Sequence, residues 1–418
     1  MDFVTTAPQA VRKFQHDMDF TAALLQLALQ GRRVEALVTP LFNGPQLETY
    51  QVALGVGVEP EKVERLSGAL AMAAGASYCR VARAEGRLLI EVPKPKRERR
   101  TLRARRLASV KPPTHFHVPL GLGTTGQIVW LDLADERTCH VVIGGTTGSG
   151  KTNALHWLLR CLLVHNPLGR LRLLLADPKR KELDPFVLSR HLLHPVAYDL
   201  TEIIKMLLWV QSTMAERAEH GITQPKILMV VDEVKELAQR DRRVLDVMSS
   251  IAQLGRGVGI CLIVTTQQPG AKALGEALPN FPARLLGRVT SATLTFGAAG
   301  RARSQAETLL GRGDMLLITY DGLTRLQVPL VTEAELAAIP RWESADRVPR
   351  LDLPEAVNWS TPPGVDTRGG WNRTPLDLDA VRQAVEDGAT ARDLQTLFGI
   401  NYDRARRLVN RFGGGYED

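Results

Sequence analysis

The feature that most constrains the fold of this chain is a glycine-rich octapeptide, GTTGSGKT, which runs from Gly145 to Thr152. It follows a short apolar run, HVVIG, and precedes a stretch with helical spacing of apolar residues. The pattern GxxxxGK[ST] between a strand and a helix is that of a P-loop, in which backbone N–H groups close around phosphate oxygens. The sequence therefore predicts an α/β domain that binds a nucleotide.

The P-loop residues have separate expected roles. Lys151 is expected to reach the β- and γ-phosphates of ATP, and the Thr152 hydroxyl is expected to hold Mg²⁺. The start of the following helix adds the positive end of a helix dipole. The predicted nucleotide-binding residues are Gly145, Thr146, Thr147, Gly148, Ser149, Gly150, Lys151 and Thr152.

A second apolar run, KILMVVDE, ends in the acidic pair Asp232 and Glu233. After a buried strand, Asp232 is expected to bind Mg²⁺ and Glu233 to polarise the attacking water as a general base. The alternative is an acidic pair that only caps the next helix.

Two further residues are candidates for roles in hydrolysis. Gln267 ends the run ICLIVTT, where a polar side chain could sense the γ-phosphate. Arg256, in AQLGRGVG, is a candidate arginine finger that acts across a subunit boundary. The alternatives are an ordinary loop glutamine and a surface arginine in a glycine-rich turn.

Hydrophobic patterning divides the chain into parts. Between 116 and 340, β-rich apolar runs (HVVIGG, LRLLLAD, KILMVVDE, ICLIVTTQ and DMLLIT) alternate with helical stretches, as expected for buried parallel strands with crossover helices. Alternating segments before this region predict a small α+β module. The predicted parts are a helical segment at 1–35, an α+β subdomain with a basic linker at 36–115, a P-loop domain at 116–340, a linker at 341–373 and a helix-turn-helix unit at 374–418.

The overall charge of +8, from 53 basic and 45 acidic residues, favours an anionic partner, although a mildly basic protein without one is equally compatible. The most basic stretch is KPKRERRTLRARR, from Lys94 to Arg106. Such a run is usually a solvated linker; the alternative is a surface that faces a phosphate backbone.

Cysteine usage and hydropathy indicate the compartment. The four cysteines, Cys79, Cys139, Cys161 and Cys261, lie far apart and lack metal-ligand spacing, as expected for core residues in a reducing compartment. No apolar run approaches the roughly 18 residues that cross a bilayer, and the N-terminus lacks a signal-peptide pattern. We therefore expect a cytoplasmic protein without membrane insertion.

Taken in order, several motifs resemble the FtsK/SpoIIIE family of DNA translocases: GTTGSGKT, LADPKRKEL, MVVDEVKEL, GRGVGICLIVTTQQP, NFPAR and LLGRGDML. The resemblance covers about residues 36–340 and a short C-terminal stretch. It implies a RecA-like motor domain beside an α subdomain, with ATP and Mg²⁺ as cofactors. It also implies a homo-oligomeric ring, typically a hexamer, that threads double-stranded DNA. The implied ATPase positions are Lys151, Thr152, Asp232, Glu233, Gln267 and Arg256, and Arg284 would lie in a DNA-facing loop near 268–284.

This chain departs from the family pattern in four respects. The family often has TQRP where this chain has Thr266-Gln267-Gln268-Pro269, and often a lysine at the position of Leu278. Loss of that positive charge would weaken the grip on the DNA backbone. The segment LTFGAAGRARSQ replaces a family Asp-Ser-Arg segment, so subunit contacts there stay open. No counterpart is recognised for the membrane-spanning region of many relatives, which predicts a role away from a division septum.

The C-terminal segment predicts three helices that end in a helix-turn-helix. ATARDLQTLFGINYDRARRLV is similar to the family's γ domain, a winged helix that reads short oriented DNA sequences. In that view 403–411 is the recognition helix, and Arg404, Arg406 and Arg407 contact guanine edges or phosphates. The alternative is an arginine-rich helix that docks against another surface.

Three functions follow from these predictions. The leading one is an ATP-dependent translocase of double-stranded DNA. The second is an ATP-dependent DNA-binding assembly switch, such as a replication initiator or regulator. The third is a protein-coupling ATPase of a secretion or conjugation system. Stimulation of ATP hydrolysis by duplex DNA separates the first from the others, and any protein partner is unknown.

Overall fold

The structure is a computed structural model that describes residues 18–270, 274–290 and 304–354, with five isolated positions further along the chain. The chain divides into two units, residues 1–357 and 358–418. Apart from those five positions, the predicted helix-turn-helix, including Arg404, Arg406 and Arg407, lies outside the described residues, as does most of the predicted 341–373 linker. The architecture below is that of the first unit.

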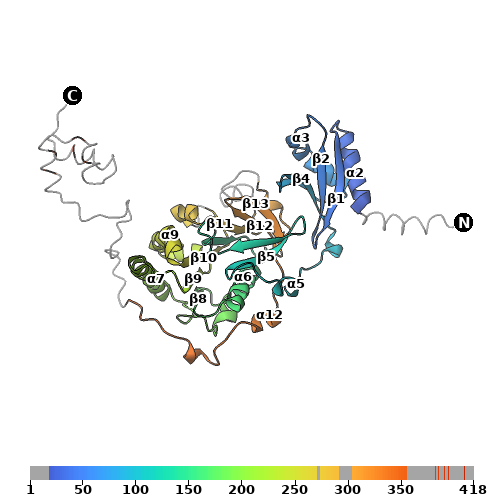
Figure 1. Ribbon diagram of the computed structural model, residues 1–418. Helices are drawn as coiled ribbons and strands as arrows, with labels where there is room; N and C mark the ends of the chain where they lie inside the picture. The colour runs from blue at the N-terminus through green and yellow to red at the C-terminus, as the bar shows by residue number, and fades with distance from the viewer. Residues whose placement is uncertain are drawn as a thin grey trace. The chain divides into compact units, whose positions relative to one another are not determined.

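A small α+β subdomain comes first, drawn in blue in Figure 1. Helix α2 (Met18–Gln30) packs on an antiparallel sheet of order β1-β2-β4-β3. The buried side chains of Leu25 and Leu29 from α2 join Tyr50 and Ile90 in one core. The elements are β1 (Ala36–Asn43), β2 (Leu47–Leu54), α3 (Pro60–Glu64), α4 (Ser67–Ala73), β3 (Arg80–Ala84) and β4 (Arg87–Pro93).

A basic segment joins this subdomain to the next and contains η1 (Lys96–Glu98) and α5 (Arg105–Ala108). Its apolar residues Leu102 and Leu107 are 1% and 3% exposed, in the core of the following domain. Leu102 O accepts a hydrogen bond of 2.7 Å from Leu330 N. The stretch expected as a solvated linker is therefore anchored along its second half.

The second sheet has nine strands in the order β6-β5-β13-β12-β11-β7-β10-β9-β8. Strands β11, β7, β10, β9 and β8 are parallel, and the other pairings are antiparallel. The strands are β5 (His117–Gly123), β6 (Ile128–Asp132), β7 (Val141–Gly144), β8 (Leu171–Ala176), β9 (Lys226–Val231), β10 (Ile260–Thr266), β11 (Ala283–Leu286), β12 (Asp314–Thr319) and β13 (Gly322–Gln327).

The prediction that DMLLIT is a parallel strand is wrong. This run is β12, which pairs antiparallel with both β11 and β13. Only two residues, Tyr320 and Asp321, separate β12 from β13. A loop this short can connect only antiparallel neighbours, because a parallel pair needs a crossover of a dozen or more residues.

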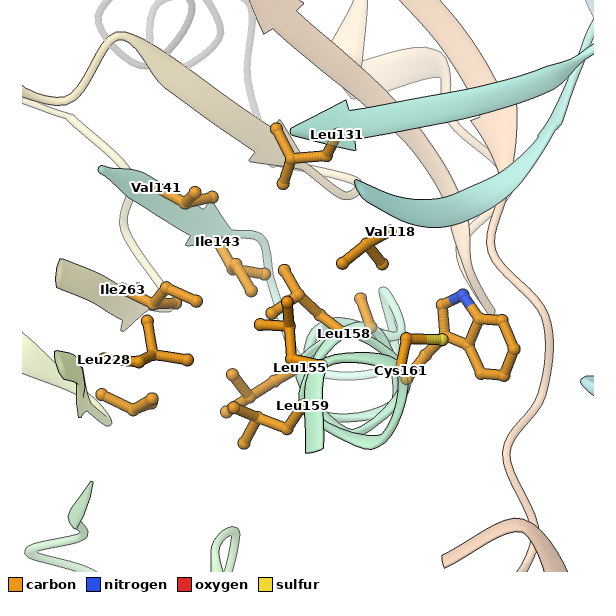
Figure 2. Close-up of a cluster of buried hydrophobic side chains, with 14 of the residues drawn as sticks. Val118, Leu131, Val141, Ile143, Leu155, Leu158, Leu159, Cys161, Leu228 and Ile263 are labelled. Atoms are coloured by element: carbon orange, nitrogen blue, oxygen red, sulfur yellow. The ribbon is translucent and has the colours of Figure 1, made fainter. Parts of the chain in front are cut away.

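Helices pack on the sheet and complete the α/β motor fold (Figure 1). In α6, Leu155, Leu158 and Leu159 face Val141 and Ile143 of β7 (Figure 2). Each fully buried leucine contributes about 1.5–3 kcal/mol, so this face holds the helix that follows the P-loop. The helices and 3₁₀ segments are α6 (Lys151–His165), η2 (Asp184–Phe186), α7 (Leu200–His220), α8 (Val234–Arg240), α9 (Arg243–Leu254), η3 (Gly255–Val258), η4 (Gly275–Asn280), η5 (Ala306–Thr308), α12 (Glu333–Ala337) and η6 (Ala345–Arg347).

The two sheets meet at a buried group of charges. Arg325 of β13 donates to Asp314 of β12 (2.6 and 2.9 Å) and to Glu91 of β4 (2.7 Å). Glu91 also accepts from Arg80 of β3 at 3.0 and 3.1 Å. Tyr78 accepts a further hydrogen bond from Arg325. Charged groups from both sheets therefore hold the junction together.

Among the described residues, no helix is both long enough and apolar enough to cross a membrane.

Candidate nucleotide-binding site

The P-loop lies between the end of β7 and the start of α6, where Gly150 is the N-cap residue. Gly148 and Gly150 have φ angles of 78° and 100°, which favour glycine because a Cβ is disfavoured there. A Cβ on Gly150 would also lie 2.5 Å from Gly313 N. The glycine pattern is therefore required both by the turn and by a neighbouring segment.

Two segments brace this loop. Thr146 N donates to Arg288 O at 2.9 Å, just after β11. On the other side, Arg312 N donates to Gly148 O at 3.0 Å and Gly313 N to Ser149 O at 2.8 Å. The LLGRGDML motif, which had no assigned role in the sequence, thus forms a turn against the P-loop. The glycines of this motif were the feature of the sequence that could have indicated a close contact with the P-loop backbone.

The lysine and the second acid are brought together. Lys151 Nζ lies 3.3 Å from Glu233 Oε2, and Glu233 Oε1 accepts from Gln267 N at 3.2 Å. Glu233 is the N-cap residue of α8, but its side chain makes no capping hydrogen bond. Capping of the next helix, the alternative for this acid, is therefore not what its side chain does.

Thr265 is a site residue that the sequence analysis missed. It is fully buried on β10, and its hydroxyl donates to Asp232 Oδ1. The same oxygen accepts from Glu233 N at 3.1 Å and from Lys151 Nζ at 3.4 Å. One donor and two acceptor positions are all that a hydroxyl offers, so this group is fully used. The signal was a polar residue near the end of an otherwise apolar strand.

The two acids have opposite pKa shifts. Burial raises the pKa of Asp232, and the Thr265 hydrogen bond and the charge of Lys151 offset only part of this effect. Burial would also raise the pKa of Glu233, but Lys151, the N–H of Gln267 and Lys179 outweigh it and hold the pKa below its ordinary value. Glu233 is therefore an ionised carboxylate held by cations.

Lys179, from the LADPKRKEL motif, is a second cation beside Glu233. Its Nζ lies 3.5 Å from Glu233 Oε2 and 3.4 Å from Glu236 Oε2. The buried carboxylate of Asp177 accepts N–H groups from the loop that carries this lysine, at 2.9–3.1 Å. The loop is therefore held in place beside the acid, a role that the sequence motif alone did not reveal.

The remaining candidates lie apart from this cluster. Arg256 is exposed on η3, before the start of β10, whereas the P-loop follows the carboxyl end of the parallel strand β7. Arg256 is therefore at the opposite edge of the sheet from the P-loop of its own chain. The side chain of Gln267 is exposed next to Glu233. An action of Arg256 across a subunit boundary stays a prediction.

Arg284, the predicted DNA contact, bonds within its own loop. Its guanidinium donates to Phe281 O and Leu278 O, both at 3.3 Å, and burial lowers its pKa. Leu278 is 6% exposed. These contacts hold the loop that precedes β11, and contact of Arg284 with DNA stays a prediction.

Two family models match the chain and together span just over half of it. The FtsK alpha domain matches residues 1–95, and the FtsK/SpoIIIE family matches residues 103–222. Similar curated proteins include DNA translocase FtsK of Caulobacter vibrioides, 29% identical over 93% of this chain and 54% of that protein. DNA translocase FtsK of Lactiplantibacillus plantarum is also 29% identical, over 92% of this chain and 52% of that protein. The chain thus spans about half the length of these relatives.

A solved structure shares the fold. The conjugation coupling protein TcpA of pCW3, in a monomer form with ATPγS, superposes with a TM-score of 0.51 at 18% identity. The match covers 75% of this chain and 96% of that one. The P-loop and the acid pair after β9 agree with the two consecutive family matches. This chain belongs to the FtsK/SpoIIIE family.

Proposed function

We propose that this protein is an ATP-dependent translocase of double-stranded DNA that hydrolyses ATP at the subunit interfaces of a ring. The observation that carries the proposal is the contact of Lys151 with Glu233, 3.3 Å apart at the carboxyl edge of a P-loop sheet. The relatives described as DNA translocases support DNA as the substrate, and the choice of duplex DNA rests on the family resemblance. A ring of six subunits rests on the family resemblance.

The site suits a nucleoside triphosphate with Mg²⁺. Thr152 and Asp232 are hard oxygen donors near one sheet edge, and Mg²⁺ in such sites needs only one or two protein ligands besides phosphates and water. Bound Mg²⁺ would neutralise charge that develops on the phosphates.

The contact of Lys151 with Glu233 suggests how binding prepares hydrolysis. Phosphates compete with the carboxylate for the ammonium group of Lys151, because both are anionic partners of one cation. When Lys151 turns to the phosphates, Glu233 keeps the N–H of Gln267 and the charge of Lys179. Its carboxylate is then able to accept a proton from the attacking water.

A neighbouring subunit would complete the site. Arg256 lies at the edge of the sheet opposite its own P-loop, so a head-to-tail arrangement of subunits would present it to the next nucleotide. There it would stabilise negative charge in the transition state. The loop at 268–284 would contact the phosphate backbone without regard to sequence. The C-terminal arginines Arg404, Arg406 and Arg407 would add the contacts that read sequence.

The decisive experiment is steady-state ATP hydrolysis by the full chain without DNA, with single-stranded DNA and with long duplex DNA, beside a Lys151→Ala control. Strong stimulation by duplex that is lost in the control supports a motor. Hydrolysis that is indifferent to DNA would overturn the proposal in favour of a protein-coupling ATPase. Slow hydrolysis with sequence-selective DNA binding would instead indicate an assembly switch.

A further inference from the structure

The basic segment between the two sheets has a fixed backbone. Its side chains Leu102 and Leu107 are buried, and its Ala104 N donates a hydrogen bond of 3.1 Å to Leu330 O. The flanking residues of Leu330 are in turn held by Asn153 of α6, which donates to Pro329 O at 2.8 Å and accepts from Val331 N at 2.9 Å. The segment is therefore tied to the first turn of the helix that follows the P-loop.

The start of the segment is fixed to the first sheet as well. Lys94 N donates to Gln46 O at 3.0 Å, and Arg100 N donates to Pro45 O at 2.8 Å. Both ends of the run are thus anchored by backbone hydrogen bonds. A flexible charged linker would not have these bonds, so the side chains are displayed from a defined path.

The cations of this segment face outward. The exposed basic residues are Lys96, Arg97, Arg100, Arg103, Arg105 and Arg106, here called the basic surface. Within the described part of the chain, only Arg97 of this set has an acidic partner, Glu98 at 3.0 Å. So many like charges on one fixed segment repel one another, a cost that an anionic ligand would remove.

We propose that the basic surface binds the phosphate backbone of duplex DNA, as a contact separate from the loop at 268–284. The proposal rests on the proposed function in taking duplex DNA as the partner. Five of the six cations are arginines, whose guanidinium groups match phosphate geometry bidentately.

The composition of the segment favours this partner over two others. It contains no aromatic residue, so it has no platform on which the bases of a single strand could stack. Its leucines are buried, so it offers no large apolar side chain to a lipid interior. Contacts made only by guanidinium and ammonium groups to phosphates are independent of sequence.

The test replaces Arg100, Arg103, Arg105 and Arg106 with glutamine in the full chain. A matched control replaces four exposed arginines elsewhere, Arg32, Arg65, Arg87 and Arg242, with the same loss of charge. Binding to a labelled duplex is measured by fluorescence anisotropy over a series of salt concentrations. We expect the test variant to bind roughly tenfold or more weakly, with a salt slope smaller by about 3 to 4, and the control to change little.

Several results would overturn the proposal. These are unchanged duplex binding by the test variant, an equal loss in the control, or no duplex binding by the wild type. A loss of binding to vesicles containing phosphatidylserine, without a loss of duplex binding, would make the surface a membrane contact. A changed molar mass in sedimentation would make it a subunit contact. Thermal unfolding and DNA-independent ATP hydrolysis check that the variant is folded.

The proposed function can fail without this inference. If duplex DNA does not stimulate hydrolysis but its binding depends on these arginines, the proposed translocase function is wrong and the proposed DNA contact of the basic surface is supported. If duplex DNA stimulates hydrolysis and the test variant binds and responds as the wild type does, the proposed translocase function is supported and the proposed DNA contact of the basic surface is wrong.

Discussion

Two buried groups of charge in this molecule are built differently. At the junction of the sheets, Arg80, Glu91, Asp314 and Arg325 balance two cations against two carboxylates, with contacts of 2.6–3.1 Å. Both guanidinium groups make more than one hydrogen bond, and Arg325 uses the several donors of its planar guanidinium to bond Asp314 and Glu91 together. The junction is therefore complete by itself.

The nucleotide site is not complete in this way. Lys151 reaches Glu233 through one contact of 3.3 Å, and Asp232 accepts a hydrogen bond from the neutral hydroxyl of Thr265. Burial raises the pKa of Asp232, whereas two arginines outweigh burial and lower the pKa of Glu91. A closed group, in which every charge is paired within the protein, stabilises the junction. An open group, in which the pairing is incomplete, keeps interactions available for a ligand. Substitutions in the two groups should therefore affect different measurements.

The largest effect on stability is expected from Arg325→Met. Removing this guanidinium leaves Asp314 and one side of Glu91 buried without their cation, which costs about 3–5 kcal/mol of unfolding free energy. Urea unfolding measures this loss. The control is Arg83→Met in β3, which removes an exposed pair with Glu61 and Glu64 of α3 and should change stability little. Equal losses in both variants would mean that the junction has no special role.

The largest effect on activity is expected from Glu233→Gln. An amide cannot accept the proton of water, so hydrolysis should fall by about 10²–10⁴-fold while nucleotide binding and unfolding free energy are retained. Single-turnover hydrolysis and binding of a fluorescent ATP analogue measure the two properties. Glu236→Gln is the matched control, since Glu236 pairs with Lys179 but not with Lys151. Normal turnover in Glu233→Gln would assign the base to another residue.

A smaller effect is expected from Thr265→Val, which keeps the shape but removes the hydroxyl. The loss leaves Asp232, Lys151 and the N–H of Glu233 each with one partner fewer, at a cost of about 1–3 kcal/mol. We expect hydrolysis to fall by about tenfold and Thr265→Ser to restore most of it. Thr266→Val is the control, because that hydroxyl bonds Gln268 N outside the charged group. Identical serine and valine variants would contradict the role.

Some of this organisation could be predicted from sequence. The P-loop and the acid pair are local motifs, so their place after apolar runs predicted that the carboxyl ends of β7 and β9 would hold the site. Thr265 was missed because its role depends on register: Val264 of β10 pairs with Val231 of β9, which places the next residue beside Asp232. No periodicity in β10 reveals this pairing.

The junction and the basic segment show a second limit. Glu91 and Arg325 are 234 positions apart, and each is an ordinary charged residue in its own strand. The sequence favoured a solvated linker at Lys94–Arg106 because its charge outweighs its single leucine. Leu102, and Leu107 just after the run, are buried because the core of the following domain receives them. Both features depend on partners that local composition does not identify.

The smallest predicted effect concerns pH, where the two groups should differ in sign. The pKa of Glu91 is lower in the folded state, so its contribution to stability is present above its ordinary pKa and is lost as pH falls through the folded one. Asp232 has a raised pKa, so its ionised form costs stability at neutral pH, and this cost disappears as pH falls. Urea unfolding against pH should therefore show lower stability and a weaker acid dependence for Glu91→Gln. Asp232→Asn should be more stable than the wild type at neutral pH. If the stability of both variants changes in the same direction at neutral pH, the contrast between a closed and an open group of charges is refuted.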